Sequence, residues 1–315
     1  MYKFLQLIRF PNLVMIALTQ LIFFYCWITH FETCYIKIDL FLCVIFATVF
    51  IAAGGNIIND IFDVKTDRIN KPHKVFIDTF ISKKNAYLLY FLFTFVGIDL
   101  GSYTGFAIDR WWISLLFIGI AILLFFYSSH LKGVPVLGNI VVSALVASSL
   151  LILIAFENDY KVSRKHIHLF DGVSVVAIKI YALFAFWINL MRELVKDIED
   201  VNGDYNANIS TLPIILGRNR VNKITAILAA LLICFILYVI SIYLQGKTVT
   251  TVYVLFTILL PLLYFIIKIW QADSKREYKM LSLLLKFIML FGILSTLVFY
   301  YFDPEDILTI ILRKL

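Results

Sequence analysis

At the end of a long apolar run the chain reads NIINDIFDVKTD, from Asn56 to Asp67. Its three aspartates, Asp60, Asp63 and Asp67, stand in the pattern D-x-x-D-x-x-x-D. At 3.6 residues per turn, the second and third lie about 60° and 20° behind the first. A helix would therefore carry all three on one face, whereas a loop beginning at the last one would gather them in a tight cluster. Like charges this close repel one another and lower stability unless a cation lies among them, and a divalent ion is the expected partner.

The same pattern returns later in the chain, and the filler residues also match, as Asp-Ile-x-Asp-Val-x-x-Asp. Two acidic clusters of equal spacing predict one shared site, because Mg²⁺ binds through one or two carboxylates together with the phosphates of a substrate. The alternative is that these are solvated acids that end two apolar spans. The predicted metal ligands, which are also the predicted catalytic residues, are Asp60, Asp63, Asp67, Asp197, Asp200 and Asp204.

The composition predicts a polytopic membrane protein that is all-α. Of its 315 residues 62% are hydrophobic and 16% are charged, and the mean hydropathy is +0.91. A soluble domain averages about 45–50% apolar and about 25% charged residues. Because a span needs roughly 20 apolar residues, the sequence predicts nine transmembrane helices, at about 11–29, 39–60, 86–104, 111–128, 138–156, 173–191, 222–244, 251–270 and 283–302.

The distribution of Lys and Arg predicts that the N-terminus is cytoplasmic. With this orientation, the cytoplasmic segments hold about twice as many of these residues as the opposite side. Both acidic clusters then lie on the cytoplasmic face of the cell membrane, in predicted loops 61–85 and 192–221. We expect one domain over 1–302, followed by an interfacial amphipathic helix at 303–315. The net charge of +7 is modest, and loop basicity in a membrane protein sets topology, so no nucleic-acid partner is expected.

Basic and amide side chains accompany both clusters and predict a site for a diphosphate. Lys and Arg supply the positive charge that a diphosphate leaving group with metal ions requires, and Asn is unfavourable inside a helix unless its side chain forms a hydrogen bond. Each of these residues taken alone is also explained as a topology determinant or a helix cap. The predicted diphosphate-binding residues are Asn56, Asn59, Arg68, Lys71, Lys132, Arg192 and Lys196.

Nine spans with N-D-x-x-D-x-x-x-D after the second and K-D-x-x-D-x-x-x-D after the sixth resemble the UbiA superfamily of intramembrane prenyltransferases. The resemblance implies helices around a central cavity, and aspartates that bind Mg²⁺ and the diphosphate of a polyprenyl donor. Within the superfamily, the segments NDIFDVKTDRINKP (59–72) and RELVKDIEDVNGD (192–204) are most similar to the geranylgeranylglycerol-phosphate geranylgeranyltransferases. The next residues, His73 to Phe76, depart from the Arg-Pro and Ser-Gly usual in the superfamily.

The expected function is therefore Mg²⁺-dependent transfer of a prenyl group, geranylgeranyl first, to a membrane-associated acceptor, with geranylgeranylglycerol phosphate as first choice. A second hypothesis keeps the chemistry and uses an aromatic acceptor, such as a quinone or tetrapyrrole precursor. A third, from another class, is a transporter that is not an enzyme. The sequence does not specify the acceptor, the donor chain length, the general base or the oligomeric state.

Overall fold

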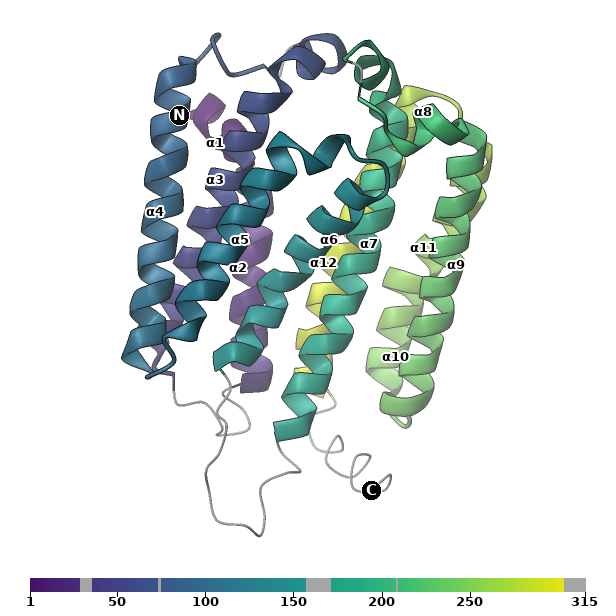
Figure 1. Cartoon of the computed structure of the whole chain (residues 1–315). Coiled ribbons are helices and arrows are strands. Elements are labelled where there is room, and N and C mark those ends of the chain that lie inside the picture. The colour runs from purple at the N-terminus through teal and green to yellow at the C-terminus, as the bar shows by residue number, and fades with distance from the viewer. Residues whose placement is uncertain (29–35, 73–74, 157–170, 208, 303–315) are drawn as a thin grey trace. The chain divides into compact units, whose positions relative to one another are not determined.

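The computed structural model describes residues 1–28, 36–72, 75–156, 171–207 and 209–302, and its regular structure over these ranges is helical (Figure 1). Among the described residues, nine helical segments are long and apolar enough to cross a membrane, which confirms the predicted all-α, polytopic membrane fold. These segments are Phe10–Trp27, Ile38–Asn70, Lys83–Ala107, Trp112–Ser129, Leu137–Phe156, Val175–Asn206, Arg218–Tyr243, Thr248–Gln271 and Lys275–Phe302.

The residues group into two compact units. Unit 1 comprises Met1–Leu21, Ile36–Leu145 and Asp200–Ile215, and unit 2 comprises the described parts of Ile22–Tyr35, Val146–Glu199 and Leu216–Leu315. The sequence predicted one domain over 1–302 around a central cavity, and both statements stay predictions. The interfacial helix predicted at 303–315 lies outside the described residues.

Unit 1 is built on α3, which packs against α4 and α5. Its core joins apolar side chains of α3, such as Ile57 and Ile61, to Leu7 of α1 and to Tyr90 of α4. The helices that lie wholly or mostly in unit 1 are α1 (Tyr2–Leu7), α2 (Phe10–Phe23), α3 (Ile38–Asn70), α4 (Lys83–Ala107), α5 (Trp112–Ser129), the 3₁₀ turn η3 (Leu131–Gly133), α6 (Leu137–Leu151) and α8 (Leu212–Leu216).

In unit 2, α9 packs against α11, and α12 packs against α10 and α11. Two of its turns, η1 and η5, are π-helical. The elements that lie wholly or mostly in unit 2 are η1 (Phe24–Ile28), η4 (Ile152–Phe156), α7 (Asp171–Asn206), α9 (Arg218–Tyr243), α10 (Thr248–Val254), η5 (Leu255–Leu259), α11 (Leu260–Gln271) and α12 (Lys275–Phe302).

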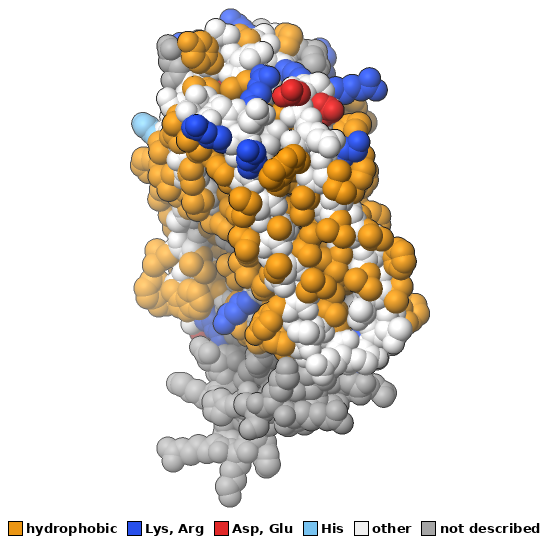
Figure 2. All heavy atoms as spheres, turned by 90° about the vertical axis from the view of Figure 1, so that its right-hand side faces the viewer, with side chains coloured by type: hydrophobic (Ala, Val, Ile, Leu, Met, Phe, Trp, Pro, Cys, Tyr) orange, Lys and Arg blue, Asp and Glu red, His pale blue; other side chains and the backbone are white. Residues whose placement is uncertain are grey.

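The surface of unit 2 agrees with a lipid environment. Figure 2 shows a broad band of hydrophobic side chains, with Asp or Glu and several Lys or Arg side chains above it and further Lys or Arg side chains at its lower edge. Leu237 and Tyr238 of α9 and Leu263 and Ile267 of α11 are all exposed. Contiguous apolar surface of this kind is unfavourable in water and is expected of helices that face lipid.

The structure continues helices into the predicted loops 61–85 and 192–221, which are helical over 61–70 and 192–206. That these loops lie on the cytoplasmic side stays a prediction. The helix α3 continues ten residues beyond the predicted span, to Asn70, because Ile61 and Thr66 continue its buried face. It ends there because Lys71 precedes Pro72, and a residue before proline is disfavoured in the helical region. The next helix, α4, begins after Ser82, whose side chain accepts a hydrogen bond from the Asn85 N–H.

Candidate active site at the two aspartate stripes

The extension of α3 places Asp60, Asp63 and Asp67 along one face of its last turns, and we call these three residues the first stripe. Asp60 and Asp63 are buried, with 9% and 7% of their surface exposed. Asn59 is also buried and donates a hydrogen bond from Nδ2 to Asp63 Oδ2 over 2.6 Å, one turn further along the helix. Buried carboxylates are unfavourable without partners, so this face of α3 requires neighbouring cations or donors.

The end of α7 carries the second stripe, Asp197, Asp200 and Asp204. Asp200 and Asp204 belong to unit 1, and Asp204 is buried. Asp197 precedes them on the same helix and belongs to unit 2. Within unit 1, Asp204 is close enough to Asp63 of the first stripe for the two charges to repel. Acids that lie far apart in the sequence are therefore electrostatic neighbours in the fold.

The amide of Asn70 joins the ends of the two helices. Its Nδ2 donates to the backbone carbonyl of Asp200 over 3.0 Å, and its Oδ1 accepts from the Gly203 N–H over 3.0 Å. A Cβ atom at Gly203 would lie 2.2 Å from Asn70 Nδ2, so no larger residue fits there without displacing the amide. Asn70 thus fixes the second stripe against the end of the helix that carries the first.

Three aspartates of unit 1 each pair with a cation from a different segment. Arg9 Nη2 lies 2.9 Å from Asp60 Oδ1, and Lys71 Nζ lies 2.5 Å from Asp200 Oδ2. Lys132, in the turn between α5 and α6, pairs with Asp63. Burial disfavours the charged form of Lys132, but attraction to Asp63 outweighs it, so the pKa of the ammonium is raised above its ordinary value. The carboxylates are thus neutralised by the protein itself.

The turn between α1 and α2 presents Arg9 to this site. Arg9 adopts a φ of 53°, which is uncommon for a residue other than glycine. The preceding carbonyl, of Ile8, accepts a hydrogen bond of 2.9 Å from Asn56 Nδ2, one turn before Asp60 on α3. The Asn56 amide thus holds the backbone next to Arg9, and its predicted role in diphosphate binding stays a prediction.

The donor set suits a magnesium ion, although no metal centre is preformed. Carboxylate oxygens are the ligands that Mg²⁺ prefers, and Oδ1 of Asp200 is buried without a hydrogen-bond partner. Within the described ranges, no three His, Cys, Asp or Glu side chains lie close enough together to hold a metal ion. Arg9, Lys132 and Lys71 contact Asp60, Asp63 and Asp200 through one carboxylate oxygen each, so a metal ion bound there would either share these carboxylates with the cations or displace them.

Arg68, Arg192 and Lys196 are the remaining residues predicted to bind diphosphate. Arg68 is exposed near the end of α3. In unit 2, Arg192 and Lys196 both contact Glu193, with N–O distances of 3.3 and 2.6 Å. Neither prediction of diphosphate binding is tested by this arrangement, and both stay predictions.

Sequence reasoning missed Arg9, Asn70 and Gly203 as site residues. Arg9 was interpreted only as a topology determinant, since nothing in the sequence shows that it folds back onto α3. Gly203 offered a signal, because glycine inside a helix costs about 1 kcal/mol relative to alanine and requires a packing reason. Its partner, Asn70, is recognisable only in the fold.

The fold and this site define a membrane-embedded helical protein with two aspartate stripes, one on α3 and one on α7. A model of the UbiA prenyltransferase family matches residues 15–302. The chain belongs to the UbiA prenyltransferase family.

Two relatives show how the chain aligns within this family. It is 34% identical over 193 residues to digeranylgeranylglyceryl phosphate synthase of Pyrococcus abyssi (strain GE5 / Orsay), an alignment that covers 60% of the chain and 62% of that relative. The chain thus spans less than two thirds of this relative's length. The enzyme of the same name from Methanococcoides burtonii is 31% identical over 306 residues, which cover 95% of the chain and 99% of the relative.

Solved structures show the same fold. A structure of digeranylgeranylglyceryl phosphate synthase has a TM-score of 0.61 and 24% identity, and covers 94% of this chain and 97% of its own. A UbiA homolog from Archaeoglobus fulgidus bound to GPP and Mg²⁺ has a TM-score of 0.59 and 16% identity, and covers 93% and 99%. At these identities the likeness supports the fold alone.

Proposed function

We propose that this protein transfers a geranylgeranyl group from its diphosphate to the hydroxyl of geranylgeranylglyceryl phosphate, with Mg²⁺ as cofactor. The observation that carries the proposal is the pair of aspartate stripes that Asn70 joins at the ends of α3 and α7. The relatives named digeranylgeranylglyceryl phosphate synthase support the choice of substrates. The homolog structure with GPP and Mg²⁺ supports the choice of cofactor.

In this reaction the bond between C1 of the prenyl chain and the diphosphate oxygen breaks. The electron pair leaves with the diphosphate, the acceptor hydroxyl oxygen bonds to C1, and the hydroxyl proton is lost. Bound Mg²⁺ would neutralise the charge that develops on the leaving group. Asp60, Asp63, Asp67, Asp200 and Asp204, together with Asp197 from the sequence pattern, would hold the metal.

The ion pairs of unit 1 suggest which cations would contact the diphosphate of the substrate. Arg9, Lys71 and Lys132 neutralise carboxylates in the free protein. If a bound metal ion displaced these cations from the carboxylates, the cations would be available to the oxygens of the diphosphate, with which charge-assisted hydrogen bonds are strong. The same residues therefore stabilise the free protein and then bind the leaving group.

We place the protein in the cell membrane, with its N-terminus and the aspartate stripes on the cytoplasmic side. The nine membrane-spanning segments and the excess of Lys and Arg on that side support this orientation. A polar diphosphate donor made in the cytoplasm would then reach the site without crossing the bilayer.

The decisive experiment incubates purified protein with labelled geranylgeranyl diphosphate and a panel of acceptors, and identifies products by mass spectrometry. We expect an ether product with geranylgeranylglyceryl phosphate that requires Mg²⁺ and is lost in the Asp63→Ala and Asp200→Ala variants. Asp39→Ala is the control, because Asp39 is exposed in the first turn of the same helix, α3. Product only with an aromatic acceptor would replace the proposed substrate, and full turnover in both aspartate variants would refute the proposed site.

A further inference from the structure

Unit 2 gathers positive charge from two of its helices. Arg192 and Lys196 stand about one turn apart on α7, and Lys286 stands on α12. Lys286 is half-buried and is close enough to Arg192 for the two charges to repel. We call these three residues the basic cluster. Because like charges that share a site are unfavourable, an anion is the expected partner of this cluster.

These charges lie well inside segments that cross the membrane. At 1.5 Å per residue, Arg192 lies about 21 Å along α7 from its end at Asn206. Lys286 lies about 16 Å along α12 from its start at Lys275. Both helices are among the spanning segments. A cation inside a span is costly, and such residues characteristically mark a site for a substrate or an ion.

The carboxylate of Glu193 does not use all the donors of the basic cluster. One of its oxygens, Oε1, lies 3.3 Å from Arg192 Nη1 and 2.6 Å from Lys196 Nζ. The Nε atom of Arg192 is buried and has no hydrogen-bond partner. A buried donor without a partner is unfavourable, so the guanidinium has the capacity for a further acceptor.

The chemistry of the basic cluster suits a phosphate group. The planar guanidinium of an arginine matches the oxygens of a phosphate, and each lysine adds a point charge. A phosphate monoester carries a charge of about −1.5 to −2 at pH 7, which would balance the three cations that surround Glu193. A neutral ligand would leave the repulsion between Arg192 and Lys286 in place.

The proposed reaction has two phosphorylated substrates, the diphosphate donor and the acceptor. The cations that pair with the aspartates of unit 1 already suit the diphosphate. On α7, Arg192 lies about 8 Å along the axis from Asp197 of the second stripe. In geranylgeranylglyceryl phosphate the attacking hydroxyl and the phosphate are on neighbouring carbons. A phosphate held at Arg192 therefore keeps the hydroxyl near the end of α7 where the stripe lies.

We propose that the basic cluster binds the phosphate of the acceptor, an inference that rests on the proposed function. Arg192 and Lys286 hold the phosphate from two helices, and Lys196 adds a third positive charge. The cluster thereby selects an acceptor that carries a phosphate over the same lipid without one. The sequence analysis did not identify Lys286 as a site residue, because it stands alone in an apolar span.

Equilibrium binding tests the basic cluster without turnover. The probes are tritiated geranylgeranylglyceryl phosphate and tritiated geranylgeranylglycerol, which lacks the phosphate. Both are measured on the full chain in detergent, without Mg²⁺ or donor. We expect the wild type to bind the phosphorylated probe at least about tenfold more tightly, and Lys286→Met and Arg192→Gln each to lose most of this preference. Binding of the unphosphorylated probe should not change, whereas a general packing defect would weaken both.

Two exposed cations of unit 2 provide matched controls. Lys279→Met removes a lysine about two turns before Lys286 on α12, and Arg220→Gln removes an arginine from the first turn of α9. Neither should change the preference. Equal binding of the two probes by the wild type would overturn the proposal, and this comparison needs no variant to fold. A preference that persists in both cluster variants, folded by thermal unfolding, would overturn it as well.

Binding of the donor distinguishes the two sources of phosphate oxygens. The affinity for geranylgeranyl diphosphate with Mg²⁺ should not change in Lys286→Met. A loss of donor affinity as large as the loss of acceptor preference would assign the basic cluster to the diphosphate and overturn the proposal. A phosphate preference that depends on the cluster, in a protein that transfers no prenyl group, would support phosphate binding there and contradict only the proposed reaction.

Discussion

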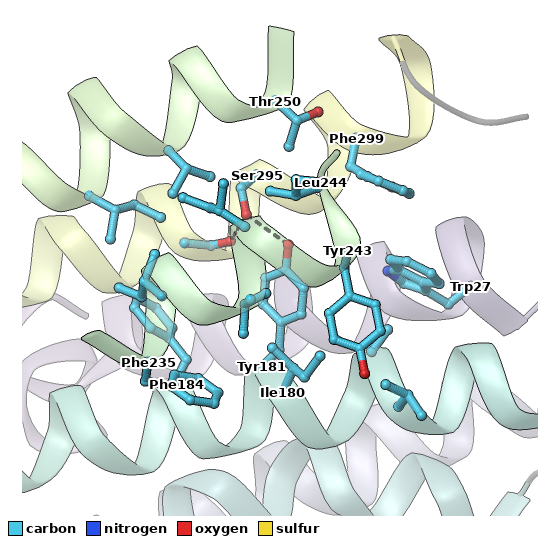
Figure 3. A pocket seen from close by; sticks show the side chains of 18 residues that line it. Trp27, Ile180, Tyr181, Phe184, Phe235, Tyr243, Leu244, Thr250, Ser295 and Phe299 are labelled. Carbon is cyan, nitrogen blue, oxygen red and sulfur yellow. Dashed lines mark hydrogen bonds between the residues drawn. The ribbon is translucent and has the colours of Figure 1, made fainter. Parts of the chain in front are cut away.

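The aspartate site of unit 1 differs in polarity from an apolar cavity of unit 2, whose lining includes Phe184, Phe235 and Phe299 (Figure 3). The site buries charged groups, and its carboxylates Asp60, Asp63 and Asp200 each contact a cation. None of the residues that line the cavity is charged, and two of its hydroxyls, at Tyr181 and Ser295, bond to each other. The site should therefore be sensitive to the loss of a charge or an amide, whereas the cavity should be sensitive to volume and tolerant of a lost hydroxyl.

The largest effect is expected where the two stripes are joined. Gly203→Ala places a Cβ against Asn70, and overpacking of this kind costs about 1–3 kcal/mol in the free energy of unfolding. Displacement of the second stripe should lower prenyl transfer by about a hundredfold, as misplacement of about 1 Å does in other active sites. Chemical unfolding and turnover in detergent measure the two quantities.

A double-mutant cycle makes this prediction specific. In the Asn70→Ala background, Gly203→Ala should lower the free energy of unfolding by less than it does in the wild type. The reason is that the Asn70 amide, which the new Cβ would contact, is absent. Gly119→Ala is the matched control, since a Cβ at Gly119 of α5 has no neighbour within 4 Å. Additive effects of the two substitutions would show that Asn70 and Gly203 act independently.

A smaller effect is expected at Lys132, the cation that pairs with Asp63. Lys132→Met should destabilise the fold by about 1–3 kcal/mol, because the buried carboxylate of Asp63 loses its cation and keeps only the hydrogen bond from Asn59. It should lower the rate of prenyl transfer more strongly, by about tenfold to a hundredfold, if the ammonium neutralises the leaving diphosphate. The rate is measured with saturating donor.

The chain offers two controls for Lys132. Lys132→Arg keeps the charge and should retain most of the activity. Lys65→Met removes a lysine from an exposed position of α3. It should change neither the free energy of unfolding nor the rate of prenyl transfer. A loss of stability without loss of rate in Lys132→Met would assign this residue a purely structural role.

The smallest effect is expected in the cavity wall. Tyr181→Phe removes one hydroxyl that bonds to Ser295, a loss of about 1 kcal/mol in unfolding free energy. The carboxylates and cations of the aspartate site are unchanged in this variant, so KM for geranylgeranyl diphosphate should not change. Tyr238→Phe, at an exposed position of α9, is the control. A large rise in KM for Tyr181→Phe would mean that the hydroxyl contacts a ligand, which contradicts an apolar cavity.

Periodicity and composition predicted the membrane fold well, because an apolar segment long enough to span a bilayer is visible in the sequence alone. The aspartate pattern likewise predicted which acids share a face. The sequence did not predict that α3 and α7 extend beyond their apolar spans. Charged residues end a span in hydropathy, but they do not end the helix. The contacts of Arg9 and Asn70 could not be predicted, because each joins segments whose proximity depends on the tertiary fold.

Because α3 is one continuous helix, it also fixes how far the first stripe lies along the direction that crosses the membrane. At 1.5 Å per residue, Asp60 lies about 33 Å along the axis from Ile38, where the helix begins. The hydrocarbon core of a bilayer is about 30 Å thick. If Ile38 stands at one boundary, Asp60 stands just beyond the other, and a rigid helix rather than a loop sets this level. A diphosphate released there can diffuse directly into water, while the hydrocarbon chain that it leaves behind stays within the membrane.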